Sequence, residues 1–246
     1  MRPPFARWRW LPPAVMTAAL VAVALLAAAG ERLNWGVFAA LLVVGLLLAG
    51  FVLVERRRSS TRELALVATL AALTAAARLP FAGLPGFQPT TFLTIVSGVA
   101  FGPWAGFSVG ATAGALSNFF LGQGPWTPWQ MLGWGLAGAS AGALRRILSI
   151  RLPFVLAGFG LVWGYLFGWL VNLWVWTSAF HPLSLESFLA VQVLSFGFDT
   201  AHALGNAVFC LFFGREALKI LGRFREKLAV REWSENETKK EASGIK

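Results

Sequence analysis

The sequence predicts an all-α polytopic membrane protein that crosses the bilayer eight times. Hydrophobic residues make up 57% of the chain and charged residues only 13%, which is about half the charged share of a soluble domain. Uncharged apolar runs, such as residues 14–29 and 36–54, have about the length that a membrane-spanning helix needs. Basic residues gather in alternate connections between such runs, as expected for loops on the cytoplasmic side.

The predicted spans are residues 12–29, 34–54, 63–78, 88–102, 104–121, 128–144, 153–177 and 187–213. The fourth is short and contains Pro89, so by length alone it could be re-entrant. If it crosses, all but two of the 21 Lys and Arg residues lie on the side of the N-terminus. A re-entrant segment would move the arginines of residues 145–151 to the other side. The positive-inside rule therefore favours eight crossings, with both termini in the cytoplasm.

The chain divides into three predicted parts. These are a two-helix transmembrane hairpin at residues 1–60, a six-helix core at 61–222 and a charged cytoplasmic tail at 223–246. The basic start followed by an apolar run could be a secretory signal, but the run is long and a second span follows closely, which favours a retained helix. The net charge of +10 follows from this topology and does not indicate nucleic acid binding.

Glycines recur every four residues on two predicted spans, and each series leads to an asparagine. The first runs from Gly102 to Gly114 and leads to Asn118; the second runs from Gly160 to Gly168 and leads to Asn172. Such stripes let helix backbones approach closely in lipid, where packing drives association. Close packing accounts for the glycines. The asparagines are either hydrogen-bonded links between helices or ligand contacts.

The last predicted span carries a polar face. Gln192, Ser195, Asp199, His202 and Asn206 are spaced by three and four residues, so they share one side of a helix. Asp199 is the only aspartate of the chain, and a carboxylate at bilayer depth costs about 2.5–3.5 kcal/mol on insertion scales. It should therefore face a partner or a wet cavity. Two interpretations stay open: an internal Asp199–His202 pair that holds helices in register, or the lining of a polar cavity.

Three predicted outer loops, residues 78–91, 122–129 and 178–187, share one rim. Residues 117–131 read SNFFLGQGPWTPWQM, which is far more aromatic and polar than a plain turn requires. Trp174 and Trp176 are interpreted as membrane-interface anchors. A pocket for a small organic molecule needs aromatic walls and a few placed polar groups. The predicted substrate-binding residues are Gln88, Thr91, Asn118, Gln123, Trp126, Trp129, Gln130, Asn172, Asp199, His202 and Asn206.

Several kinds of catalytic site are excluded. Residues 138–142 fit G-x-S-x-G but lie on a predicted membrane helix, not at a strand–turn–helix junction. The chain contains no Walker-type sequence, so it is not expected to hydrolyse ATP. Its single cysteine, Cys210, rules out a cysteine-based metal cluster. We therefore expect a protein that is not an enzyme and that holds no cofactor or metal of its own.

Residues 63–222 resemble the S component, the membrane substrate-binding subunit, of energy-coupling factor (ECF) vitamin transporters. The resemblance rests on the length of the six-helix core, on the alanine-rich segment ELALVATLAALTAAARLP, and on QPTTFLTIVSGVAFGPWAGFSVGATAGALSNFFLGQGPWTPWQM. It implies a six-helix S-component fold that captures a vitamin near the outer face, with the three outer loops as gates. It also implies that the subunit lies in the plasma membrane of a prokaryote and topples there to carry its ligand inward.

The resemblance further implies partners. Alanines spaced by four residues on the first core helix, here Ala68, Ala72 and Ala76, would dock a transmembrane scaffold subunit. Two ATPase subunits would bind ATP and Mg²⁺. The cobalamin-type branch is the first expectation for the ligand, and a pyrimidine, a thiamin precursor or another vitamin stays open.

The alternative function is a self-sufficient proton-coupled carrier that uses Asp199 and His202.

Overall fold

The computed structural model describes residues 35–55, 60–145, 147 and 152–242, and these ranges contain helices and no strand. The elements are α2 (Trp35–Glu55), α3 (Thr61–Arg78), η2 (Leu79–Phe81), α4 (Thr90–Phe101), α5 (Pro103–Leu121), α6 (Thr127–Leu144), α7 (Pro153–Ala179) and α8 (Leu185–Ala242). The all-helical prediction is thus confirmed for this part of the chain. The predicted first span, residues 12–29, lies outside the described ranges, as does the turn that joins it to the second span.

Local sequence signals set the helix ends. Ser60 caps α3 in a capping box: its Oγ accepts from the Glu63 amide at 3.2 Å, and Glu63 Oε2 accepts from the Ser60 amide at 3.1 Å. Proline occupies the first turn of α5, α6 and α7, where its missing N–H costs nothing. Gly102, with φ of +107°, makes the sharp link between α4 and α5.

Helix α4 lies at the centre of the bundle, and almost all of its residues are buried. It contacts α3, α5, α6, α7 and α8. Its 12 residues cover only about 18 Å of a hydrocarbon layer about 30 Å thick. The non-helical chain before it reaches α8, where Gly86 packs on the backbone of Phe198 and His202. Irregular backbone at membrane depth is stable where protein covers it, and Gly86 and Pro89 of this segment are buried.

Three described helices are long and apolar enough to cross a membrane by themselves: Trp35–Glu55, Thr61–Phe81 and Pro153–Ala179. These agree with the second, third and seventh predicted spans. The remaining predicted spans of the core are helical as expected, but the full number of eight crossings stays a prediction. Helix α8 continues to Ala242, well beyond the predicted end of its span at residue 213.

Both glycine stripes pack against a neighbouring helix. On α5, a Cβ at Gly106 would meet the Gly138 carbonyl of α6, and one at Gly110 would meet the Trp134 carbonyl. On α7, Gly164 packs on the backbone of Ala203 of α8. Close approach of backbones therefore explains the glycines, as the small-residue pattern predicts.

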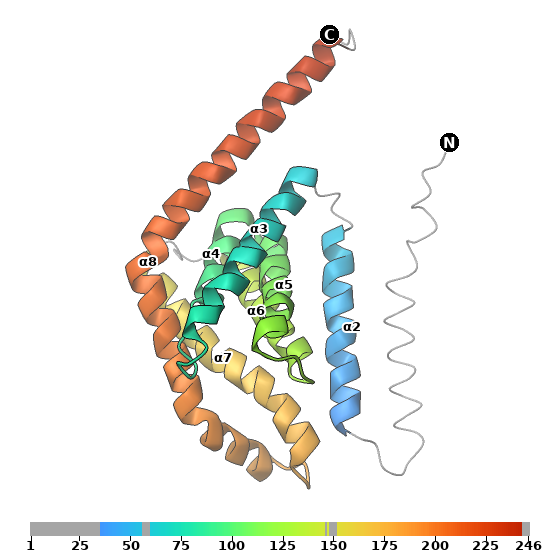
Figure 1. Ribbon diagram of the computed structural model, residues 1–246, viewed down its shortest axis with the longest axis vertical. Helices are drawn as coiled ribbons and strands as arrows, with labels where there is room; N and C mark the ends of the chain where they lie inside the picture. Colours follow the sequence, from blue (N-terminus) through green and yellow to red (C-terminus); the bar gives the residue numbers. More distant parts are fainter. Residues whose placement is uncertain (1–34, 56–59, 146, 148–151, 243–246) are drawn as a thin grey trace, which may run out of the picture.

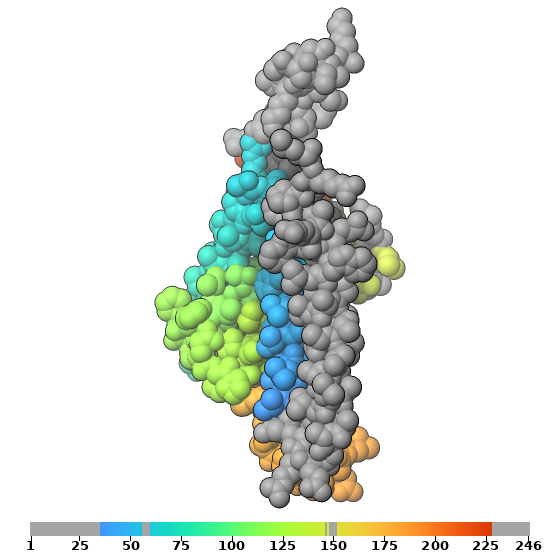
Figure 2. All heavy atoms as spheres, turned by 90° about the vertical axis from the view of Figure 1, so that its right-hand side faces the viewer, coloured from blue at the N-terminus to red at the C-terminus, as the bar shows by residue number. Residues whose placement is uncertain are grey.

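Helix α2 lies against the six-helix core. Its Ala39, Val43 and Leu47 join an apolar cluster with Phe107 of α5 and Trp129 of α6. Figure 2 shows α2 in blue beside the green surface of α5 and α6. One helix of the predicted hairpin is thus packed on the core through apolar side chains.

The three connections predicted as outer loops lie at one end of the bundle, and the C-terminal part of α8 projects from the other (Figure 1). At that second end, Arg145 and Arg225 each donate to the carbonyl of Ala100 at 3.3 Å, in the last turn of α4. Cations at a helix C-terminus are favourable because carbonyl groups gather there. The aromatic and polar loops thus share the end away from the C-terminal basic residues.

Candidate substrate-binding site

A cavity of about 320 Å³ opens at the end of the bundle that carries these loops. This volume is at the lower end of the range for small-molecule sites, which is roughly 300–1,000 Å³. Helices α3, α6, α7 and α8 and the segment before α4 all contribute to it. Its lining residues are Arg78, Gln88, Trp126, Gln130, Phe167, Gly168, Val171, Asn172, Trp174, Ser195, Phe198, Asp199 and His202.

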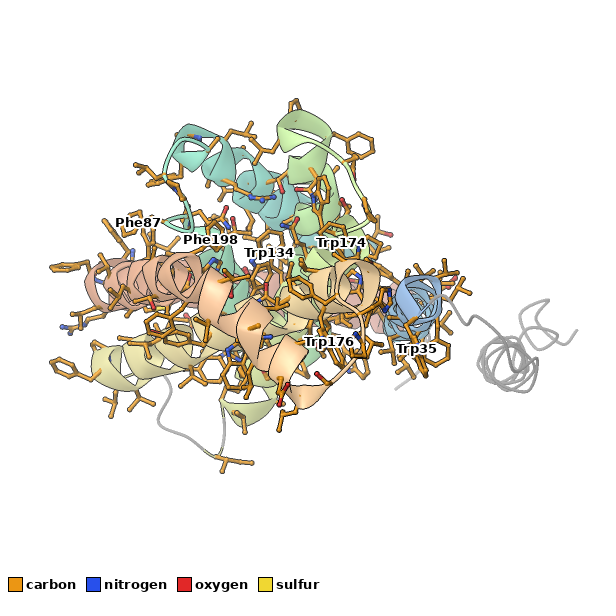
Figure 3. All side chains as sticks on the ribbon, turned by 90° about the horizontal axis from the view of Figure 1, so that it is seen from below. Trp35, Phe87, Trp134, Trp174, Trp176 and Phe198 are labelled. Carbon is orange, nitrogen blue, oxygen red and sulfur yellow. The ribbon has the colours of Figure 1, made fainter. Side chains whose placement is uncertain are left out.

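Aromatic side chains form much of the cavity wall. Trp126, from the loop before α6, meets Trp174 of α7 edge to face, with ring centroids 5.6 Å apart. Deeper in the bundle, Phe167 stacks on the His202 ring at 5.0 Å and contacts Trp134 at 4.7 Å. In Figure 3, which looks along the bundle from the loop end, Trp134 lies near the middle, between Phe198 and Trp174. Such walls suit a flat ring.

One polar group of the cavity is centred on Arg78, at the end of α3. Its Nε donates to Gln88 Oε1, and its Nη1 donates to Ser117 Oγ and Asn118 Oδ1, each at 2.7 Å. Its guanidinium lies 4.8 Å from the centre of the Trp134 ring. Asn118 Nδ2 in turn donates to Thr127 Oγ1 and Gln130 Oε1. We call these residues the Arg78 cluster: Arg78, Gln88, Ser117, Asn118, Thr127 and Gln130.

A second polar group is centred on Asp199 of α8. Ser195 Oγ donates to Asp199 Oδ2 at 2.7 Å. Asn172 Nδ2, from α7, donates to Ser195 Oγ at 2.7 Å and to Gln192 Oε1 at 2.8 Å. A Cβ at Gly168 would overlap the Asp199 carboxyl, so the last glycine of the α7 stripe makes room for this group. Asp199, Ser195, Asn172 and Gln192 form the Asp199 cluster.

His202 belongs to neither cluster. Its Nε2 lies 2.9 Å from Thr91 Oγ1, which also accepts from Trp134 Nε1 at 3.0 Å. Its Nδ1 is buried without a partner among the described residues. His202 and Asp199 form no hydrogen bond with each other in the described structure. The internal Asp199–His202 pair that the sequence left open is therefore absent, and the two side chains meet only as parts of one cavity wall.

The structure brings six of the predicted binding residues to the cavity: Gln88, Trp126, Gln130, Asn172, Asp199 and His202. Two others stand behind its wall, Asn118 in the Arg78 cluster and Thr91 against His202. Three lie elsewhere. Gln123 is exposed and bonds the Ala115 carbonyl, Trp129 is buried beside α2, and Asn206 donates to the Gly160 carbonyl of α7.

Sequence reasoning did not select seven lining residues: Arg78, Phe167, Gly168, Val171, Trp174, Ser195 and Phe198. Arg78 carried a usable signal, because it is a rare cation on the predicted outer side and ends an apolar helix. Trp174 was interpreted as a membrane anchor, and the structure corrects this, since its ring forms part of the cavity wall. Ser195 already belonged to the polar face of α8.

The predicted gate loops contribute unequally. Residues 78–91 supply Arg78 and Gln88, and residues 122–129 supply Trp126. Residues 178–187 supply no lining residue, and Ser187 instead bonds within its own loop and to Trp176. No group of three His, Cys, Asp or Glu residues that could hold a metal ion occurs in the described ranges.

Comparison with known proteins identifies the family. Residues 58–214 match a family model described as ECF-type riboflavin transporter, S component. Two curated relatives, UPF0397 proteins from Aliivibrio fischeri strains MJ11 and ATCC 700601 / ES114, are each 32% identical over 123 residues, which covers 43% of this chain and 67% of the relative. No solved structure matches.

The matched segment covers the predicted core up to residue 214, including every residue that lines the cavity. Members of the matched family are integral membrane proteins that bind a small molecule for a transporter, and they are not enzymes. The apolar helices and the aromatic, polar cavity agree with that description. The chain is therefore a member of the ECF transporter S-component family.

Proposed function

We propose that this chain is the substrate-capture subunit of an ECF-type importer and that it takes riboflavin from outside the cell. The observation that carries this proposal is the cavity between Trp126, Trp174 and Phe167, with a polar cluster on α3 and α6 and another on α7 and α8. Flat aromatic walls and separate polar groups suit a flavin, which combines a large planar ring with a hydroxylated chain.

The cavity volume bears on the choice of vitamin. About 320 Å³ suits one ring system with a short chain. Cobalamin, with a corrin ring and a nucleotide loop, is several times larger than a flavin and would need a much wider opening of the loops. The description of the matched family also names riboflavin. Both observations favour riboflavin over the cobalamin expected from the sequence.

A binding titration tests this proposal. The full chain, purified in detergent, should quench flavin fluorescence through its cavity tryptophans and bind riboflavin with a Kd below about 1 µM. Cobalamin and thiamin should not displace it. Tight binding of cobalamin or thiamin instead of riboflavin would reject the ligand and keep the capture role. Absence of binding by all three would count against capture itself.

Transport requires a scaffold subunit and two ATPases, and the surface of α3 supports this part of the proposal. Ala68, Ala72 and Ala76 are all exposed, whereas Ala71 and Ala75 face the core. A smooth exposed stripe suits close helix packing against another membrane subunit. Helix α2 packs on α5, α6 and α7 and leaves these three alanines uncovered.

Ala72→Leu should abolish co-purification with the scaffold and leave riboflavin affinity unchanged, because the added side chain points away from the cavity. Ala143→Leu is a matched control, since Ala143 is exposed on α6 outside the stripe. Normal assembly of the Ala72→Leu variant would remove the stripe from the docking surface.

A further inference from the structure

The two polar clusters of the cavity have opposite hydrogen-bonding polarity, and each is fixed by its charged member. Arginine can only donate, and an ionised carboxylate can only accept. Neither Arg78 nor Asp199 forms an ion pair with any described residue, and no described hydrogen bond joins the two clusters. Both side chains line the same cavity. A cation and an acid that share a cavity without pairing leave their remaining bonding capacity for a ligand.

The bonds of the Arg78 cluster leave donors unused. Because Arg78 donates to Gln88 Oε1, the Gln88 amide nitrogen stays available. Arg78 also donates to Asn118 Oδ1, so Asn118 donates to Gln130 Oε1, and this leaves the Gln130 amide nitrogen available. Arg78 Nη2 forms no bond with a described residue. The groups free to contact a ligand on this side are therefore N–H donors.

The bonds of the Asp199 cluster leave acceptors unused. The Ser195 hydroxyl donates to Asp199 Oδ2 at 2.7 Å and has the Gln192 carbonyl within reach at 3.2 Å, so it keeps no hydrogen for a ligand. Its oxygen accepts from Asn172 Nδ2, which also donates to Gln192, so both hydrogens of the Asn172 amide are used. Asn172 Oδ1 forms no bond with a described residue, and the Asp199 carboxylate, which interacts with the Ser195 and Asn172 side chains, can accept further hydrogen bonds. Gln192 Nε2 also has no partner among the described residues, but it is buried and Gln192 does not line the cavity. The free groups on the cavity-lining residues of this cluster are therefore oxygen acceptors.

We infer that the cavity selects and orients its ligand by this polarity, with ligand acceptors at the Arg78 cluster and ligand donors at the Asp199 cluster. This inference rests on the proposed function. For riboflavin it directs the ring carbonyls toward Arg78, Gln88 and Gln130, and the ribityl hydroxyls toward Asp199 and Asn172. The reverse orientation would bring two partly negative ring carbonyl oxygens against the Asp199 carboxyl, with only the N3–H between them as a donor, and is therefore less favourable.

Lumiflavin provides a test, because it has the same ring and a methyl group in place of the ribityl chain. Riboflavin and lumiflavin are titrated into the wild type, Asp199→Asn and Arg78→Gln. We expect Asp199→Asn to weaken riboflavin roughly 10- to 100-fold and lumiflavin less than about threefold, because bonds to charged groups are the strong ones. Arg78→Gln should weaken both flavins by a similar factor. Glu216→Gln and Arg215→Gln make the same chemical changes at exposed positions of α8 and should change neither.

The ratio of the two affinities is measured on one protein sample, so partial unfolding cannot produce a change in it. Equal loss of both flavins in Asp199→Asn, or no loss in either variant, would overturn the orientation while leaving capture intact. A larger loss of riboflavin than of lumiflavin in Arg78→Gln would indicate the reverse orientation and also overturn it. Failure of the wild type to bind riboflavin would reject the proposed ligand together with this inference.

Discussion

The two glycine stripes look alike in sequence but have different structural roles at their outer ends. On α5, the steps from Gly106 to Gly114 meet backbone or a large ring of α6, and the stripe stays packed throughout. On α7, Gly160 and Gly164 pack on α8 in the same way, but Gly168 faces the Asp199 carboxyl. The first stripe is an interface over its whole length, and the second becomes a cavity wall at its outer end.

This difference follows from what the partner helix presents. Helix α6 offers the Gly138 and Trp134 carbonyls to α5, and these cannot move without disturbing the helix. Helix α8 offers Asp199 at the last step, and a side chain can turn toward open space. A missing Cβ therefore permits close backbone packing at one site, and it creates room for a functional group at the other.

The largest loss of stability should come from adding a side chain within the glycine stripe of α5. Gly106→Ala would drive its Cβ into the Gly138 backbone, which has no room to yield, and should destabilise the fold by about 3 kcal/mol. Gly158→Ala, on α7, has no atom within 4 Å of the new Cβ and should be neutral or slightly stabilising, because alanine favours the helix more than glycine does. Thermal unfolding in detergent measures both. Equal stability of the two variants would show that the α5 contact tolerates a side chain.

The next effect should separate binding from folding. Gly168→Ala displaces the Asp199 carboxyl, the far end of a side chain beside a cavity, so the fold should lose less than in Gly106→Ala. Riboflavin affinity should fall roughly tenfold or more, because Asp199 could no longer keep its bond with Ser195. Fluorescence titration and thermal unfolding of the same sample give both values. A stability loss as large as that of Gly106→Ala, without loss of binding, would contradict the contrast between the stripes.

Much of the fold could be predicted because apolar length and glycine spacing act locally. The ends of α5 and α7 differ from the predicted spans by at most two residues, since proline starts both helices. The end of α8 could not be found from apolar length, because the helix continues through charged residues to Ala242. A charged sequence ends a membrane span without ending a helix.

The site was harder to predict, because polarity along one helix does not show what another helix brings to it. The spacing correctly indicated a polar face from Gln192 to His202. It also predicted Asn206 as a site residue, whereas the structure places Asn206 outside the cavity, where it donates to the Gly160 carbonyl. Arg78 was missed because its role comes from contacts with residues 10 to 40 positions away, from Gln88 to Asn118. Such contacts depend on the packing of α3 on α5.

The smallest effect should distinguish the two asparagines that end the stripes. Asn118 is linked to Arg78, Thr127 and Gln130, and its side chain is fully buried. Asn118→Ala would leave these partners unsatisfied and should cost about 2 kcal/mol. Asn172→Ala removes bonds to Gln192 and Ser195 beside the cavity, where water can replace them, and should cost about 1 kcal/mol or less. Unfolding of both variants under identical detergent conditions measures this difference. A larger loss at Asn172 would mean that the α7–α8 end, and not the Arg78 cluster, carries the stability of the outer half.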